Sequence, residues 1–226
     1  MPTQQEAHIT EILGDNKLMM LRYDTQAFPF AWAMRQEAFF GLSLSGIHHQ
    51  CIKANIKKGR ATPLTAADMQ YFRHRMRNVS EEGVFYRLYH RFVRQVVAPC
   101  FGDKISYTQH PEMRVHLAGT PACSAWHTDV EVTKRIDQIN VWLPLVDTHG
   151  TNTLWIETDY GLKDYRPIPV RYGEALLFDG SCLGHGTVRN ESDKTRVSLD
   201  FRLSVKTYPT PKHFLQLIAS RPHEPS

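Results

Sequence analysis

The chain has 226 residues, of which 42% are hydrophobic, and its formal net charge is +4 at pH 7. This length suits one domain, and the hydrophobic fraction is enough for a buried core, so a globally disordered chain is excluded. The basic excess is mild and typical of an ordinary protein surface, so nucleic acid is not an expected partner.

The chain shows none of the usual signs of export or membrane insertion. Residues 1–17 lack the apolar core of a signal peptide, and no run approaches the roughly 18 apolar residues of a membrane span. The four cysteines, at positions 51, 100, 123 and 182, form no CxxC pair. We therefore expect a cytoplasmic protein with reduced thiols and no membrane partner.

The first sixty residues have a mixed pattern. Residues 17–23 are typical of a strand, and a short helix is expected over residues 32–40, closed by Gly41. His48 and His49 follow, and we interpret both as loop histidines.

Two helices are expected between residues 63 and 98. Thr65 is a plausible N-cap for a helix over residues 66–77. Ser80 is expected to cap the second helix, which Pro99 ends. The apolar stripe of this second helix consists of Val84, Phe85, Leu88, Phe92 and Val96.

From about residue 104 the pattern changes to short strands separated by turn residues. These strands are expected at residues 113–117, 125–130, 138–145, 153–157, 174–178 and 196–204. Helices followed by strands indicate an α+β protein, mainly β, with the N-terminal helices packed on one face of an antiparallel sheet. We expect one domain, 1–226, with a mixed helical support region at 1–103, a strand-rich core at 104–205 and a C-terminal tail at 206–226.

The strand expected at residues 125–130 contains an HxD motif. Residues i and i+2 of a strand point to the same face, so His127 and Asp129 would project together. His185 follows 56 residues after Asp129, between two glycines that leave room for its ring. Two histidines and one carboxylate with open coordination positions form the facial triad of non-haem iron(II) oxygenases.

An RxS motif follows the last histidine. Arg196 lies eleven residues after His185, and Ser198 shares its strand face. A guanidinium and a hydroxyl together can bind a carboxylate through charge-assisted hydrogen bonds. Each motif alone is common by chance, but their order and spacing together predict a metal site beside a carboxylate anchor.

The ordered motifs HxD, His and RxS resemble those of the iron(II)/2-oxoglutarate-dependent oxygenase superfamily. Three segments strengthen the resemblance, namely 139–145 (INVWLPL), 151–157 (TNTLWIE) and 196–201 (RVSLDF). They are similar to the branch of streptomycin-biosynthesis hydroxylase-like proteins, and more loosely to phytanoyl-CoA-type dioxygenases. The resemblance covers roughly residues 110–205.

The resemblance implies a double-stranded β-helix, or jelly roll, as the core. It implies that His127, Asp129 and His185 hold Fe(II), and that Arg196, assisted by Ser198, binds the distal carboxylate of the co-substrate 2-oxoglutarate. O2 would be the second co-substrate, and hydroxylation the default outcome, with desaturation or cyclisation as alternatives. Halogenating members have a small residue in place of the carboxylate ligand, so Asp129 disfavours halogenation.

Four further residues share strand faces near these motifs. Asn140 and Trp142 share one face, from which Asn140 would touch 2-oxoglutarate and Trp142 the substrate. Both are equally well explained as ordinary core residues. Arg114 and His116 share a face of the preceding strand. Arg114 would meet 2-oxoglutarate or an anionic substrate, or else form an internal salt bridge, and His116 is a candidate for substrate contact.

The substrate expected from the branch is a small molecule, an amino acid or a natural-product intermediate, with an anionic or zwitterionic character favoured by the arginines. Three other functions remain open. They are an iron-dependent oxidase that does not use 2-oxoglutarate, a non-catalytic jelly-roll binding module, and a zinc hydrolase. The last is disfavoured because the sequence lacks the helical HExxH spacing. The sequence does not indicate an oligomeric state.

Overall fold

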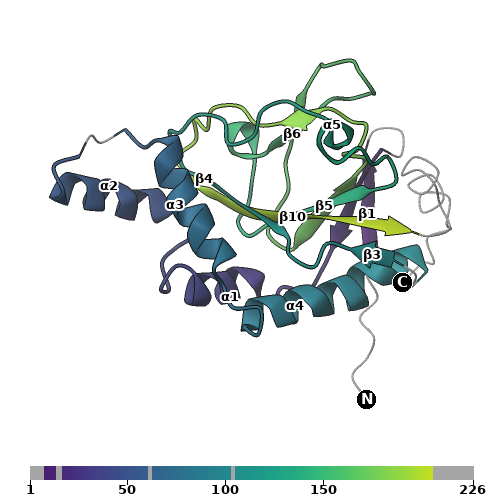
Figure 1. Cartoon of the computed structure of the whole chain (residues 1–226), viewed down its shortest axis with the longest axis horizontal. Helices are drawn as coiled ribbons and strands as arrows, with labels where there is room; N and C mark the ends of the chain where they lie inside the picture. Colours follow the sequence, from purple (N-terminus) through teal and green to yellow (C-terminus); the bar gives the residue numbers. More distant parts are fainter. Residues whose placement is uncertain (1–7, 14–16, 61–62, 103–104, 206–226) are drawn as a thin grey trace.

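The computed structural model describes residues 8–13, 17–60, 63–102 and 105–205, which form helices and antiparallel sheets (Figure 1). The expected tail at 206–226 lies outside the described residues. The prediction of a protein with both helices and antiparallel sheets is confirmed.

A seven-stranded antiparallel sheet runs through the molecule. Its order is β1-β2-β8-β5-β10-β3, and β4 also pairs with β10. The strands are β1 (His8–Leu13), β2 (Leu18–Arg22), β3 (Ile105–Tyr107), β4 (Glu112–His116), β5 (Ile139–Pro144), β8 (Glu174–Phe178) and β10 (Arg196–Val205). The long β10 pairs with β5 along one edge and with β4 and then β3 along the other. It therefore links the parts of the sheet that surround the site.

A second, smaller sheet has the order β7-β6-β9. Its strands are β6 (Leu154–Ile156), β7 (Arg166–Ile168) and β9 (His185–Gly186). A single antiparallel bridge between His127 and His185 adds the segment around His127 to its β9 edge. Both histidines of the expected metal site are thereby brought side by side.

The helices α1 (Phe30–Glu37), α3 (Ala66–Arg77) and α4 (Val84–Phe92) lie along one face of the main sheet, while α2 (Ile47–Lys57) extends beyond the sheet at the left of Figure 1. The helix α4 continues as the π-helix η1 (Val93–Val97) and the 3-10 helix η2 (Ala98–Phe101). Later in the chain come α5 (Asp129–Thr133) and the 3-10 turn η3 (Gly150–Asn152). Among the described residues, no helix combines the length and the apolar character that crossing a membrane would require.

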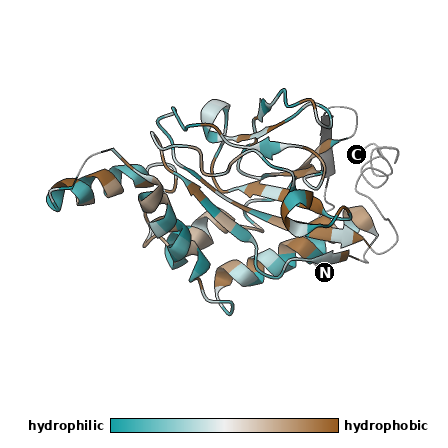
Figure 2. Ribbon diagram, turned by 45° about the horizontal axis from the view of Figure 1, so that its top comes forward, coloured by the Kyte–Doolittle hydropathy of each residue, from teal (hydrophilic) through white to brown (hydrophobic). Residues whose placement is uncertain are grey.

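Two apolar cores lie on opposite faces of the main sheet. Because side chains alternate along a strand, Val197, Leu199 and Phe201 of β10 join the core that packs against α1, α3 and α4. The second core, between the sheets, contains Leu18, Met20, Trp142, Leu154, Ile156, Val170, Leu176, Phe178 and Leu183. Hydrophilic residues are prominent along α3 in Figure 2, as expected for a helix with one solvent-exposed face.

The predicted start of α3 is confirmed. Thr65 is its N-cap, and it forms a reciprocal capping box with Asp68, whose carboxylate accepts the Thr65 backbone N–H at 2.8 Å. The strands predicted at 17–23, 113–117, 138–145, 153–157, 174–178 and 196–204 are also present, with ends shifted by at most one residue.

The predicted cap of the next helix is wrong. The helix α4 begins after Gly83, not after Ser80. Its first N–H groups, from Val84 and Phe85, donate to the carboxylate of Glu37 at 2.6 and 3.2 Å. A carboxylate distant in the sequence supplies the acceptor that a local serine was expected to provide, and a helix N-terminus favours such a negative charge.

The interpretation of His48 and His49 as loop histidines is also wrong, because both lie on α2. His48 is buried, and its Nδ1 lies 3.0 Å from the Thr195 hydroxyl. This contact spans most of the chain and could not be read from the local sequence.

Candidate metal and co-substrate site

The HxD segment folds differently from the strand expected at 125–130. His127 lies in a one-residue bridge, exchanging backbone hydrogen bonds of 3.0 and 2.9 Å with His185. Asp129 then begins the helix α5, for which Thr128 is the N-cap in a capping box with Glu131. The sequence signal for this helix start is the T-x-x-E pattern of Thr128 and Glu131, which here prevails over strand alternation.

The three predicted metal ligands nevertheless converge. Asp129 Oδ1 lies 3.5 Å from His127 Nε2 and 3.8 Å from His185 Nε2. One ligand atom from each residue lies within 4.8 Å of the other two. Two imidazole nitrogens and one carboxylate oxygen therefore face a common point, as a divalent ion of the first transition series requires.

Both histidines have the tautomer that metal binding needs. Each Nδ1 lies close to a backbone carbonyl oxygen, that of Ala125 at 2.8 Å for His127 and that of Leu183 at 2.9 Å for His185. A carbonyl only accepts, so Nδ1 of each ring carries a proton and Nε2 is the nitrogen that faces Asp129 and can bind a metal. The hydrogen bond with Asp129 raises the pKa of His127, so a metal ion would displace a proton from its Nε2.

The protonation of the site also suits metal binding. Burial, together with the neighbouring His127, lowers the pKa of His185 to about 4, so this ring is neutral at neutral pH. Burial alone would raise the pKa of Asp129, but hydrogen bonds with His127 and Arg202 outweigh it and hold the pKa well below its usual range. The carboxylate is therefore ionised.

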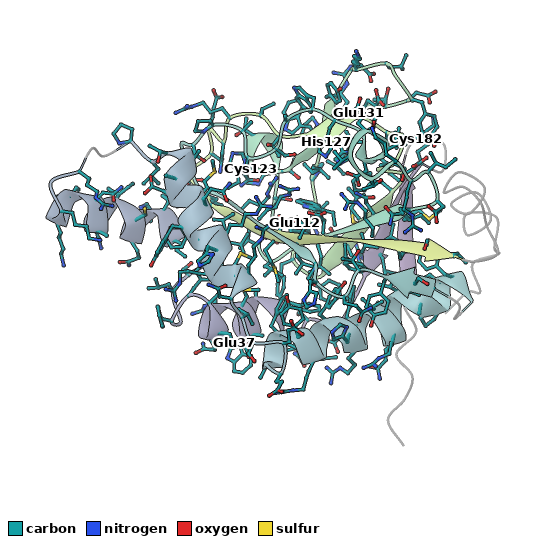
Figure 3. The ribbon with its side chains drawn as sticks, viewed as in Figure 1. Glu37, Glu112, Cys123, His127, Glu131 and Cys182 are labelled. Atoms are coloured by element: carbon teal, nitrogen blue, oxygen red, sulfur yellow. The ribbon has the colours of Figure 1, made fainter. Side chains whose placement is uncertain are left out.

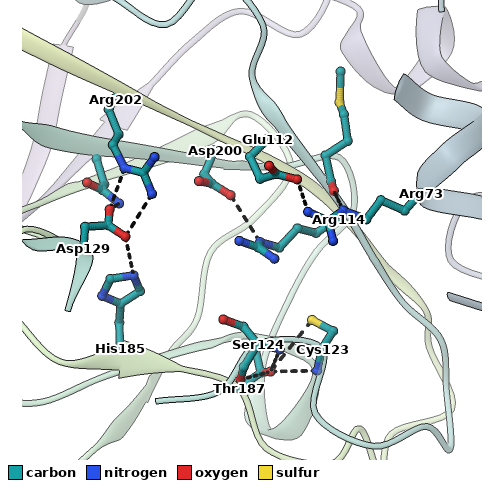
Figure 4. A network of polar contacts seen from close by, with 12 residues as sticks. Arg73, Glu112, Arg114, Cys123, Ser124, Asp129, His185, Thr187, Asp200 and Arg202 are labelled. Carbon is teal, nitrogen blue, oxygen red and sulfur yellow. Dashed lines mark hydrogen bonds and ion pairs between the residues drawn. The ribbon is translucent and has the colours of Figure 1, made fainter. Parts of the chain in front are cut away.

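Asp129 is buried and held by two side chains of the main sheet. Arg202 donates from Nε to Oδ2 at 2.7 Å and from Nη2 to Oδ1 at 2.9 Å, and Asn140 donates to Oδ2 at 2.7 Å (Figure 4). Sequence reasoning missed Arg202. The signal was available, since it lies on the same face of β10 as Arg196 and Ser198, continuing their period of two.

The glycines beside His185 are required by close packing. A Cβ at Gly186 would lie 2.7 Å from the ring of Trp126 and 3.1 Å from the carbonyl oxygen of Ala125. A Cβ at Gly184 would lie 3.1 Å from the carboxylate of Glu157. A larger residue at either position would therefore force its neighbours to move.

Arg196 is fully buried next to the ligands. It donates to the carbonyl oxygen of Thr153 at 3.2 Å and to Cys123 Sγ at 2.9 Å, and its guanidinium lies 5.7 Å from the centre of the Trp142 ring. Within the described part of the chain, Arg196 Nε and the buried hydroxyl of Ser198 have no hydrogen-bond partner. Buried unpaired polar groups are costly, so these two donors are available to pair with a ligand or a water molecule.

Cys123 is the sulfur partner of Arg196, and its label lies near that of His127 and far from that of Glu37 in Figure 3. Burial alone would raise the pKa of its thiol, but the charge of Arg196 and the neighbouring His116 outweigh burial and lower the pKa to about 5. The side chain is therefore a thiolate at neutral pH, and it balances the charge of Arg196.

We predict that Cys123 is the fastest of the four cysteines to react with iodoacetamide at pH 6.5. Only a thiolate attacks this reagent, and burial raises the pKa of Cys51 to about 11 and also raises that of Cys182. The reaction is followed by peptide mass spectrometry, with Arg196→Met, which removes the neighbouring charge, as the comparison. Equal labelling of Cys123 and Cys182 would contradict the prediction.

The other predicted residues are placed as follows. Arg114 pairs with Asp200, with its Nε 3.4 Å from Oδ1, so the internal salt bridge is present (Figure 4). His116 is buried with Nε2 3.0 Å from the carbonyl oxygen of Pro121. Trp142 lies in the core between the sheets. Contacts of these residues with a co-substrate or substrate remain predictions.

One pocket gathers most of these side chains. Its lining includes the three predicted metal ligands together with Arg114, Asn140, Trp142, Arg196, Asp200 and Arg202. The cavity between them is about 30 Å³, enough for a single water molecule. A larger molecule can therefore enter only if some of these side chains move apart.

No protein-family model matches the sequence. The streptomycin biosynthesis protein StrG of Streptomyces griseus is 33% identical over 187 residues, which cover 82% of this chain and 84% of StrG. The structure of SnoK, a non-haem α-ketoglutarate-dependent carbocyclase from nogalamycin biosynthesis, is similar in fold, with a TM-score of 0.50 and 13% identity over 93% of this chain and 88% of SnoK. The crystal structure of EvdMO1 matches with a TM-score of 0.44 and 15% identity, over 55% of this chain and 33% of the EvdMO1 chain.

The fold is similar to that of a non-haem, α-ketoglutarate-dependent enzyme, and the site contains three residues that could hold a metal ion. The identity with StrG over most of both chains shows that this protein belongs to the StrG-like family. This family is the streptomycin-biosynthesis branch that the ordered motifs resemble.

Proposed function

We propose that the protein is an iron(II)/2-oxoglutarate-dependent dioxygenase that oxidises, and most simply hydroxylates, a small molecule in the cytoplasm. The observation that carries the proposal is the placement of three ligand atoms within 4.8 Å of one another, next to a buried arginine and a buried serine with unpaired polar atoms. A metal centre beside a carboxylate anchor is the arrangement that this chemistry requires.

We further propose that the strands form a double-stranded β-helix within one domain. The strand order β4-β10-β5-β8 in the main sheet supports this, as does the order β9-β6-β7 in the small sheet with the His127 bridge at its edge. A four-stranded part of the main sheet facing a three-stranded sheet that the bridge extends is consistent with a jelly roll. The metal ligands would then lie at one end, between the two layers.

In this proposal His127, Asp129 and His185 hold Fe(II), and the residues around them keep the three ligand atoms in place. When bound, the iron supplies the activation of O2 that is coupled to the oxidation of 2-oxoglutarate. The carbonyls of Ala125 and Leu183 fix the imidazole tautomers.

The proposed anchor for 2-oxoglutarate is Arg196 with Ser198. The free Nε–H of Arg196 and the hydroxyl of Ser198 are donors already buried, so a carboxylate would satisfy both groups. Thr153 and Cys123 hold the remaining guanidinium nitrogens in position. Contacts of Asn140 and Arg114 with the co-substrate are part of the same proposal.

The proposed substrate is anionic or zwitterionic. The pocket is lined by three arginines, Arg114, Arg196 and Arg202, but by only two aspartates, Asp129 and Asp200. The Cys123 thiolate balances Arg196, so the support comes from the guanidinium donors of these arginines and not from an excess of charge. An amino acid or a natural-product intermediate with an acidic group would pair with such donors.

The test is an anaerobic titration of the metal-free protein with Fe(II) and then 2-oxoglutarate, followed by visible absorbance. We expect a weak metal-to-ligand charge-transfer band, because 2-oxoglutarate should chelate the metal through two oxygens. Iron binding without the band would favour an oxidase that does not use 2-oxoglutarate. Absence of iron binding would favour a non-catalytic binding module and would contradict the proposal.

A further inference from the structure

The two oxygens of the Asp129 carboxylate accept different numbers of hydrogen bonds. Oδ2 accepts two hydrogen bonds, from Asn140 Nδ2 and from Arg202 Nε, both at 2.7 Å. Oδ1 accepts one, from Arg202 Nη2 at 2.9 Å, and faces Nε2 of both histidines. A carboxylate oxygen has about two lone-pair positions, so Oδ2 is saturated, while the second position of Oδ1 is directed toward the two histidines.

The two residues that donate these hydrogen bonds are held in place by the main sheet. Arg202 of β10 and Asn140 of β5 are directly paired across the two strands, so both side chains reach Asp129 from neighbouring positions. Gly180 makes room for Asn140, because a Cβ at this position would lie 2.5 Å from its side-chain amide. Arg202 and Asn140 together form what we call the Asp129 clamp.

We propose that the Asp129 clamp, and Arg202 above all, restricts Asp129 to binding the metal through Oδ1 alone. Arg202 is thus a positioning residue that preserves the coordination positions needed for 2-oxoglutarate and O2. The proposal rests on the metal-binding part of the proposed function. The proposal goes beyond the proposed function, because it assigns a role to a residue outside the HxD, His and RxS motifs.

The physical reason is the number of coordination positions. An octahedral ion held by two imidazoles and one carboxylate oxygen keeps about three positions open. Chelation by 2-oxoglutarate uses two and O2 one. If Oδ2 also bound, one of these positions would be lost. The two-point contact of Arg202, which spans both oxygens, fixes the carboxylate so that Oδ2 points away from the histidines.

The experiment counts metal-bound water and needs no turnover. Mn(II) is added to the native protein, to Arg202→Met and to Arg202→Lys, and the relaxation rate of water protons is measured. Arg135→Met is the matched control, because it removes an exposed arginine–aspartate pair, with Nη2 2.6 Å from Asp137 Oδ2. Thermal unfolding of each variant checks that the protein is folded.

We expect Arg202→Met to bind Mn(II) but to lose about one third of the inner-sphere water contribution, since one of about three open positions is taken by Oδ2. Arg202→Lys should show the same loss, because lysine keeps the charge without the two-point contact. It also provides the test if Arg202→Met does not fold. Arg135→Met should equal the native protein.

Three results would overturn the proposal. They are native relaxation in Arg202→Met, native relaxation in Arg202→Lys, and loss of Mn(II) binding in both folded variants. The outcome is separable from that of the proposed function, because adding 2-oxoglutarate to the native Mn(II) complex reports chelation independently. If 2-oxoglutarate does not displace metal-bound water from the native protein, the proposed function is contradicted. The proposal for the Asp129 clamp would not be affected by this result.

Discussion

Asp129→Ala should abolish iron-dependent oxidation and weaken metal binding by about 100-fold or more, beyond what loss of an outer-shell partner typically costs. The substitution removes the only anionic ligand of the set, whose oxygen lies 3.5 and 3.8 Å from the two imidazole nitrogens. Metal content after dialysis and the conversion of 2-oxoglutarate to succinate are the measurements.

Folding must be checked alongside, because the substitution also deprives Arg202 of its partner. Asp137→Ala is a suitable control, since Asp137 also pairs with an arginine but is partly exposed and is not among the residues that line the pocket. A folded Asp129→Ala protein with near-native activity would show that Asp129 is not a ligand.

Arg196→Ala should raise the 2-oxoglutarate requirement strongly and leave metal binding unchanged. Truncating one partner of a buried charged pair costs roughly 2–5 kcal/mol. This corresponds to a rise of about 30-fold or more in KM for 2-oxoglutarate. Arg196→Lys should recover little, because an ammonium cannot reproduce the guanidinium's simultaneous contacts with Thr153 and Cys123.

The measurement is the dependence of succinate formation on 2-oxoglutarate, together with a metal titration. Arg189→Ala is the control, since Arg189 is exposed and donates only to the backbone of Gly119. An unchanged requirement in Arg196→Ala would place the anchor elsewhere. Loss of metal binding would instead show that Arg196 supports the whole pocket.

The motif residues could be predicted because their chemistry is local and specific. His127, Asp129, His185 and Arg196 were identified from residue type, order and spacing alone, and the fold brings all four to one pocket. Their convergence did not depend on a correct local structure, since Asp129 lies at a helix start and not on a strand. The bridge between His127 and His185 provides the alignment that strand alternation was expected to give.

Residues that act through long-range contacts were not predictable in this way. Arg202 and Cys123 belong to no motif, and their roles arise from partners 73 residues away in each case. The same holds for Glu37, which caps α4 from 47 residues earlier. Such pairs are set by strand register and by helix packing, which local patterns do not encode.

The sequence by itself determined the class of chemistry, because metal ligands and a carboxylate anchor are matters of residue type and spacing. It also determined the alternation of apolar residues that builds a core on each face of the main sheet. Only the tertiary structure decided how each charge is balanced: Arg202 on Asp129, Arg114 on Asp200, and Cys123 on Arg196. Charge balance in a buried site depends on distances of a few ångströms between strands, and only the folded sheet sets these distances.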